Sequence, residues 1–324
     1  MSERGERTGT TIVAAGIDVG GTKCLGVAVD AAGRVMAECR RPTPRGEAVI
    51  DALAGVAEDL EAEAGPLPAL GVGVPGLVTL EGVLRASPNI PDVAELDVAG
   101  RLGARLEMPL VVGNDATWAV LAEWRIGAGR GHDDVVMVTL GTGIGGGVVA
   151  GGRLVVGANG FTGEFGHMVV DPNGPPCPCG RRGCWERYAS GSGLAQLARI
   201  AAVGGRLRRV VEMAGGDAAL VRGEHVQAAA REEDEAALAV VDEFARWVAI
   251  GLVNLTNALD PAMFVLGGGL AEGADLYLDP IERWFVSLLY SPQLRPHPAL
   301  AFAELGERAG AIGAALAAAE RTRR

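Results

Sequence analysis

Three cysteines and one histidine lie close together in a chain that contains few residues of either type. They form the pattern H-x9-C-x-C-x4-C, made by His167, Cys177, Cys179 and Cys184. Three thiolates and one imidazole are a standard tetrahedral ligand set for Zn²⁺, and four protein ligands leave no open position for water. The pattern therefore predicts a structural zinc site in a tight knuckle. Three free cysteines in a loop are the alternative interpretation.

Two glutamates flank this knuckle. Glu164 lies three residues before His167, and Glu186 lies two residues after Cys184. A closed zinc site would hold both carboxylates rigidly, and a sugar needs rigid acceptors for its several hydroxyls. On this interpretation the zinc builds a binding wall without contacting the reaction. Taken alone, each glutamate is also compatible with a solvated loop charge.

Two aspartates follow apolar strands. Asp115 could cap the helical stretch after it, or act as a general base at the carboxyl edge of a sheet, where α/β proteins bind ligands. Both roles are compatible, because a carboxylate at a helix N-terminus stays ionised. Asn114 beside it could orient a polar ligand. Asp18 precedes a glycine loop, which suggests Mg²⁺ in its vicinity, with a simple turn aspartate as the alternative.

Glycine loops follow three apolar strands, at 20–23, 141–147 and 267–269. The first offers backbone N–H groups, a threonine hydroxyl and a lysine to phosphate oxygens, but it lacks the P-loop spacing. The second matches GxGxxG, yet a hairpin follows it instead of a helix, which excludes a dinucleotide fingerprint. Each loop alone could be a glycine turn without a ligand. Together they predict a nucleotide held between two lobes.

The strand pattern repeats along the chain. Residues 11–40 read as strand, glycine turn, strand, turn and strand, and the same order returns near residue 135. This indicates an internal duplication of one supersecondary unit. Helices are expected over 46–64, 96–108, 116–127 and 232–259, and from 309 to the end. The stretch 202–235 carries no motif that we can assign.

Composition excludes several classes of protein. The 324 residues are 49% hydrophobic, enough for a large core, and the net charge of −11 disfavours nucleic-acid binding. The apolar run before Asp18 is too short for a signal peptide, and no later stretch is expected to span a membrane. Five cysteines without a secretory signal favour a reducing cytoplasm, in which clustered cysteines bind metal.

Taken together, these stretches resemble the ROK family (repressors, open reading frames and sugar kinases) of the actin-like ATPase superfamily. The matching motifs are DVGGTK at 18–23, GVGVPG at 71–76, SPNIP at 87–91, GND at 113–115, VTLGTGIGGGVVAGG at 138–152, GFTGEFGH at 160–167, CPCGRRGCWE at 177–186 and LGGGL at 266–270. The resemblance implies a two-lobed α/β fold of the ribonuclease H-like type. The smaller lobe would comprise 1–116 and 300–324. The larger, 117–299, would hold the zinc knuckle and the contacts of a homodimer or homotetramer.

The resemblance also implies a role for each motif. Asp115 would be the base that takes the proton of a sugar 6-hydroxyl as it attacks the γ-phosphate of ATP. His167 would serve both as a zinc ligand and as a sugar ligand, and Asp18 would lie near Mg²⁺. The other sugar contacts would come from Asn89, Asn114, Glu164 and Glu186, and the ATP contacts from Gly20, Gly21, Thr22, Lys23, Thr142, Gly143, Gly268 and Gly269.

The form CWERYASG is most similar to bacterial ATP-dependent glucokinases of the family, so we expect glucose, ATP and Mg²⁺ as reactants. Kinases for N-acetylmannosamine, N-acetylglucosamine, fructose or mannose, and polyphosphate as donor, are the enzymatic alternatives. A non-catalytic sugar-binding regulator is the alternative that is not an enzyme. Asp115 and the three glycine loops argue against a regulator, and only about ten residues precede the first strand, where family repressors carry a helix-turn-helix.

Overall fold

The computed structural model describes residues 11–87 and 89–322. It divides into two compact units. The first runs to Ile126 and also contains Val156–Phe161 and the segment from Glu307 onward; the second contains Gly127–Val155 and Thr162–Gly306. The charged prefix and the last two residues of the expected C-terminal helix lie outside the described residues.

These boundaries differ from the predicted lobes at 116 and 300. Helix α3, Asp115–Ile126, packs against α10, Ala309–Thr322, so that residues 117–126 belong to the first unit. Strand β13, Ala299–Phe302, pairs with β12, Met263–Gly267, and this pairing keeps the chain up to residue 306 in the second unit.

The first unit is built on a five-stranded sheet of order β3-β2-β1-β4-β8. Besides α3 and α10, the elements of this unit are β1 Ile12–Val19, β2 Lys23–Asp30, β3 Val35–Pro42, α1 Val49–Ala64, β4 Leu70–Val74, β5 Leu77–Val78, β6 Val83–Ala86, β7 Ala94–Asp97, α2 Val98–Gly103 and β8 Leu110–Asn114. The helix expected over 96–108 is shorter than predicted, because Asp97 still belongs to β7 and its carboxylate caps α2 at Gly100 N.

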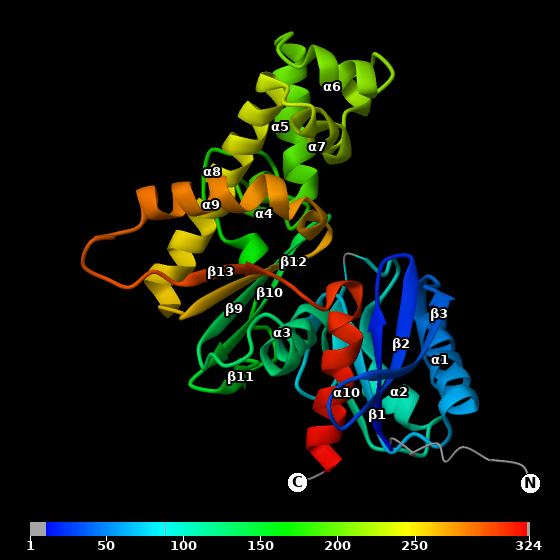
Figure 1. Cartoon of the computed structure of the whole chain (residues 1–324). Coiled ribbons are helices and arrows are strands. Elements are labelled where there is room, and N and C mark those ends of the chain that lie inside the picture. The colour runs from blue at the N-terminus through cyan, green and yellow to red at the C-terminus, as the bar shows by residue number, and fades with distance from the viewer. Residues whose placement is uncertain (1–10, 88, 323–324) are drawn as a thin grey trace, which may run out of the picture. The chain divides into compact units, whose positions relative to one another are not determined.

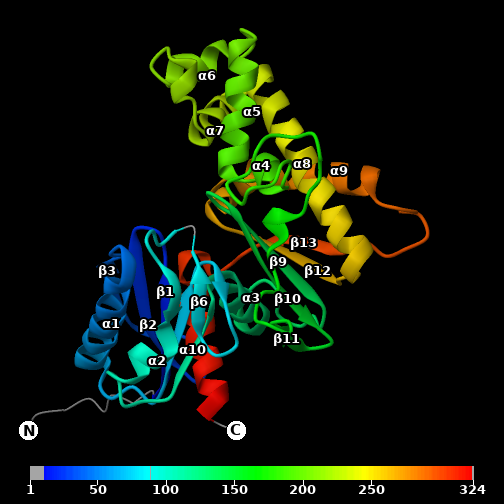
Figure 2. The same ribbon diagram turned by 180° about the vertical axis from the view of Figure 1, so that it is seen from behind.

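Glycines bring one helix onto each face of this sheet. A Cβ on Gly16 would lie 2.0 Å from the carbonyl oxygen of Ala311 in α10, and one on Gly26 would lie 2.3 Å from Val56 in α1. Gly26 pairs with Ile17, the neighbour of Gly16, and successive strand residues point to opposite faces. Hence α10 and α1 cover opposite faces, and α3 lies beside α10 (Figure 1). The small sheet β5-β6-β7, of which β6 is labelled in Figure 2, connects β4 to β8.

The second unit repeats the same sheet, in the order β11-β10-β9-β12-β13. In both sheets the first three strands are antiparallel, as the duplicated sequence pattern predicted, and the next two pairings are parallel, which that pattern did not indicate. Besides β12 and β13, the elements of the second unit are β9 Val135–Leu140, β10 Ile144–Ala150, β11 Arg153–Val155, α4 Glu186–Ala189, α5 Gly191–Val203, α6 Arg208–Met213, α7 Gly223–Arg231, α8 Glu235–Leu259 and α9 Ala274–Leu288.

Helix α8 forms the core of the second unit. Asp234 caps it by accepting from Ala237 N, and the left-handed Asp260 ends it, close to the bounds expected from the sequence. Phe244 and Val248, four residues apart on one face of this helix, are fully buried. Residues 202–235, which carried no motif, supply α6 and α7; these helices join α5 in a cluster at one end of α8 (Figures 1 and 2). Among the described helices, none is both long and apolar enough to cross a bilayer.

Candidate functional site

The predicted site residues of the first unit gather at the carboxyl edge of its sheet. Strands β1, β4 and β8 run parallel, and the register places Asp18 beside Gly73 and Gly73 beside Gly113. Asn114 and Asp115 follow Gly113 directly. The register therefore brings Asp18 and Asp115 to one edge of the sheet, the edge at which α/β sheets bind ligands.

Asn114, and not Asp115, makes the capping contact of α3. Asn114 Oδ1 accepts a hydrogen bond from Thr117 N at 3.0 Å, and its Nδ2 donates to the Gly76 carbonyl at 3.2 Å. Asp115 stands at the first helical position, where its Oδ1 accepts from Ala116 N at 2.9 Å. The helix is thus capped without the aspartate, and the predicted capping role passes to its neighbour.

Asp18 sits in a cradle of two glycines that the sequence did not reveal as functional. A Cβ on Gly73 would lie 3.5 Å from Asp18 Oδ1, and a Cβ on Gly310, in the first turn of α10, would lie 2.7 Å from Asp18 Cγ. Gly310 comes from the far end of the chain, in an alanine-rich helix. The only signal for it was the pair of glycines in AGAIGAA, which also suits simple helix packing.

Both aspartates at this edge have raised pKa values. Burial, and next the charge of Asp115, raise the pKa of Asp18 to about 8. Burial also raises the pKa of Asp115, against the opposing effect of the backbone N–H groups of Ala116 and Asp115. Asp18 Oδ1 is buried and makes no hydrogen bond to the described residues. A buried, unpartnered carboxylate oxygen beside a second carboxylate fits a nearby divalent cation, as predicted for Mg²⁺.

Asp18→Asn is expected to stabilise the cation-free protein at pH 7 by about 1–3 kcal/mol, because the buried aspartate must take up a proton on folding and an amide need not. Folded Asp18 keeps its proton up to pH about 8, whereas the unfolded chain releases it near pH 4. The stability of the wild-type protein therefore falls as the pH rises from 4 to 8, and the variant loses this part of the slope. Thermal unfolding across that range, without divalent ions, measures the difference; equal slopes would contradict the prediction.

The glycine loop at 20–23 is a tight hairpin anchored to its own unit. Gly20 N donates to the Lys23 carbonyl at 2.9 Å, and Thr43 Oγ1 donates to the Gly20 carbonyl at 2.8 Å. A Cβ on Gly21 would lie 3.9 Å from that of exposed Asn89, so the loop adjoins this predicted sugar ligand. Lys23 forms an ion pair with Glu307. Both side chains are half exposed, and an exposed ion pair contributes little free energy. Lys23 could therefore leave Glu307 and bind a phosphate at little cost in stability.

In the second unit, the four predicted zinc ligands converge. One ligand atom from each of His167, Cys177, Cys179 and Cys184 lies within 4.8 Å of all the others. Cys179 Sγ is 3.5 Å from Cys184 Sγ, and Cys177 Sγ is 3.9 Å from His167 Nδ1. Ligand atoms around tetrahedral zinc are about 3.8 Å apart for Zn–S bonds of about 2.3 Å, and a disulfide would need about 2.05 Å. The cluster could therefore hold a zinc ion.

Aromatic side chains join the knuckle to α8, and the sequence motifs gave no sign of these contacts. Trp185, fully buried, donates from Nε1 to the Trp247 carbonyl at 2.7 Å, and its ring occupies the space beside Gly251. Tyr188 stacks on Trp247 with ring centroids 3.9 Å apart, and its hydroxyl donates to Asp171 at 2.8 Å. These contacts hold Glu186, which lies between the two aromatic residues in the chain.

The predicted sugar ligands of this unit occupy distinct positions around the knuckle. Glu164 and His167 are exposed: Glu164 directly precedes one short helical turn, His167 is its last residue, and His167 N donates to the Glu164 carbonyl. Because His167 directs Nδ1 to the cysteines, its Nε2 is the nitrogen left for a sugar. Glu186 begins α4, and its Oε2 accepts from Ile144 N at 2.8 Å. Glu186 therefore also touches the glycine loop, which the sequence did not indicate.

The two glycine loops of this unit follow adjacent parallel strands, β9 and β12. A Cβ on Gly268 would lie 2.6 Å from the backbone carbon of Leu140, and its φ of +84° favours glycine. Gly269 faces open space. Gly268 therefore lies against the end of β9, where the loop carrying Thr142 and Gly143 begins, and both loops follow strands at the carboxyl edge, where α/β sheets bind ligands.

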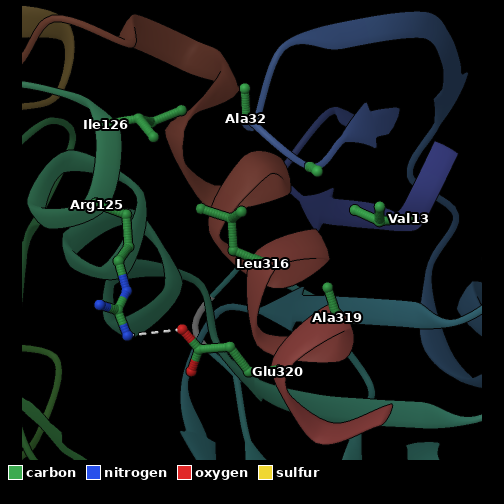
Figure 3. A pocket seen from close by; sticks show the side chains of 8 residues that line it. Val13, Ala32, Arg125, Ile126, Leu316, Ala319 and Glu320 are labelled. Atoms are coloured by element: carbon green, nitrogen blue, oxygen red, sulfur yellow. Dashed lines mark hydrogen bonds and ion pairs between the residues drawn. The ribbon is translucent and has the colours of Figure 1, made fainter. Parts of the chain in front are cut away.

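A pocket of about 440 Å³ lies at the opposite edge of the first sheet (Figure 3). Val13 at the start of β1, Ile126, Leu316 and Ala319 give it an apolar wall, and Arg125 pairs with Glu320 at 2.7 Å. None of the predicted site residues lines it.

The sequence profile of the ROK family matches residues 14–321. The chain belongs to the ROK family. The glucokinase of Streptomyces coelicolor is 39% identical over 305 residues, which cover 93% of this chain and 95% of the relative. The N-acetylmannosamine kinase of Shigella flexneri is 34% identical over 308 residues, or 93% and 97% of the two chains.

Among solved structures, a ROK glucokinase from Streptomyces griseus in complex with glucose and AMPPNP is similar, with a TM-score of 0.84 and 38% identity. The match covers 95% of this chain and 99% of that one. The α/β fold with two mixed sheets is thus the fold of ROK glucokinases.

Proposed function

We propose that this ROK protein transfers the γ-phosphoryl group of ATP to the 6-hydroxyl of D-glucose. The observation that carries the proposal is the state of Asp115. It is a carboxylate with a raised pKa at the carboxyl edge of a sheet, and Asn114 performs the helix capping in its place. A pKa raised towards the working pH suits a general base. The similar glucokinases support glucose as the acceptor.

The chain's own residues would divide the chemistry as follows. Asp115 would take the proton from the 6-hydroxyl as that oxygen attacks phosphorus. The other hydroxyls would be held by Asn89, Asn114, Glu164, His167 and Glu186. Asn114 already makes two hydrogen bonds to backbone groups, so its amide is fixed in orientation before any sugar binds. Such rigid acceptors are what positions one hydroxyl for attack.

The glycine loops would bind the nucleotide. Gly20, Gly21, Thr22 and Lys23 of the first unit, and Thr142 and Gly143 of the second, would contact phosphates, and Gly268 and Gly269 the adenosine. Mg²⁺, when bound, supplies positive charge that neutralises the phosphates during transfer. Asp18 is the residue that would hold it, directly or through water. The zinc would remain structural, and assembly into a homodimer or homotetramer stays a prediction.

The test is ADP release by the purified protein with Mg-ATP and each of glucose, mannose, fructose, N-acetylglucosamine and N-acetylmannosamine, with polyphosphate as a second donor. We expect the highest kcat/KM with glucose and ATP. Turnover confined to N-acetylmannosamine would assign the chain to the specificity of its Shigella flexneri relative and overturn the glucose assignment. Glucose binding without turnover of any sugar would identify a regulator.

A further inference from the structure

The segment from Glu186 to Ser192, which follows the knuckle, contacts the glycine loop at 141–144 at three points. Glu186 Oε2 accepts from Ile144 N, Gly191 N donates to the Gly141 carbonyl, and Ser192 Oγ donates to the Thr142 carbonyl, each at 2.8 Å. These contacts come from the end of the knuckle, through α4, to the first turn of α5. They reach Gly141 and Thr142 in the loop between β9 and β10, and Ile144, the first residue of β10.

Hydrogen bonds of Ser190, at the centre of this segment, join α4 to α5. Ser190 is fully buried, its hydroxyl donates to the Glu186 carbonyl at 2.7 Å, and it accepts from Gly193 N as the cap of α5. The loop is pressed closely against this support. A Cβ on Gly143 would lie 2.4 Å from Glu186 Oε2, and a Cβ on Gly191 would lie 3.0 Å from the Gly141 carbonyl oxygen.

The hydrogen bonds to the carbonyls of Gly141 and Thr142 also fix the direction of the N–H groups of the residues that follow them. In a trans peptide the C=O and the N–H of the next residue point in opposite directions. Because the carbonyls of Gly141 and Thr142 point at α5, the N–H groups of Thr142 and Gly143 point away from it. Successive N–H groups directed to one side form an anion-binding concavity.

We propose that Ser192 is a positioning residue for the nucleotide: its hydroxyl holds the Thr142 carbonyl so that the Gly143 N–H is directed at a phosphate oxygen. This inference rests on the proposed function, since it takes the loop at 141–144 to bind ATP. It assigns a role to a residue outside the predicted site. It also gives Glu186 two tasks, one oxygen for the loop and the other for a sugar hydroxyl.

The test compares Ser192→Ala, Ser192→Thr and the control Ser287→Ala, which changes an exposed serine on α9 of the same unit. Ser192→Ala should raise KM for ATP about threefold to tenfold, as the loss of one neutral hydrogen bond predicts, with KM for glucose changed less than twofold. Ser192→Thr keeps the hydroxyl at an exposed position and should restore the wild-type KM for ATP. Ser287→Ala should change neither constant.

Three results would overturn the inference: an unchanged KM for ATP in Ser192→Ala, an equal rise in both KM values, or no rescue by threonine. Calorimetric binding of AMPPNP without sugar separates this outcome from a failure of the proposed function. If the wild-type protein binds AMPPNP but phosphorylates no sugar, the glucokinase proposal fails, and the affinities of the variants for AMPPNP still decide the role of Ser192.

Discussion

Asp115→Asn is expected to lower kcat for glucose phosphorylation by about 1,000-fold, within the range of roughly 10²–10⁴ for a positioned general base. KM for glucose should change little, because an asparagine can still accept a hydrogen bond from the 6-hydroxyl. The variant should fold normally, since Asn114 caps α3 and the backbone contact of Asp115 is to the adjacent Ala116. Steady-state rates and thermal unfolding of the same preparations measure both effects.

The pH dependence gives a second readout of the same residue. Burial raises the pKa of Asp115, so the carboxylate ionises, and the rate rises, only above the usual range of an aspartate. The acidic limb of the kcat/KM profile should therefore lie above pH 4 in the wild-type protein and vanish in the variant. Asp279→Asn, an exposed change on α9, serves as the control. More than a tenth of the wild-type kcat in Asp115→Asn would exclude the aspartate as the base.

Removal of the metal is expected to have the other large effect. Cys184→Ser should abolish stoichiometric zinc, raise KM for glucose at least about tenfold and lower the melting temperature by about 5 °C or more. The reason is geometric: Cys184 is fully buried and adjoins Trp185, which joins the knuckle to α8. Loss of the knuckle releases Glu164, His167 and Glu186 from fixed positions, so sugar binding suffers although zinc contacts no reacting atom.

Metal analysis, glucose titrations and calorimetry test this prediction together. Cys39→Ser is the matched control, because Cys39 lies in the first unit and outside the cluster. Burial raises the pKa of Cys184 to about 12, so zinc must displace a proton from that thiol and should bind more weakly as the pH falls. Full zinc content and unchanged KM in Cys184→Ser would contradict the ligand assignment.

Most secondary structure was predictable because it depends on local patterns. The strands at 12–42 and 135–155 follow from apolar runs broken by turn residues, and α8 follows from the spacing of Phe244, Val248 and Leu255. The helix expected over 96–108 was wrong in extent, because pairing of β7 with β6 holds Asp97 in an extended strand. Long-range pairing overrides local propensity at such positions.

The two units of the structure divide at other residues than the predicted lobes, for a similar reason. Nothing in the residues near 117 or 300 reveals that α3 packs on α10 or that β13 pairs with β12. Both contacts join segments far apart in the chain, and a boundary is defined by such contacts.

By itself, the sequence determined the family, the duplicated antiparallel strands and the four Cys/His residues that converge in one cluster, because motif spacing and ligand chemistry are local properties of the chain. Tertiary structure alone decided that Asn114 caps α3 instead of Asp115, that Gly310 makes room for Asp18, and that Ser192 and Glu186 support the loop at 141–144. It also decided the raised pKa values of Asp18 and Asp115. Burial raises both pKa values and the charge of Asp115 raises that of Asp18 further, and both effects arise only when distant segments pack at one sheet edge.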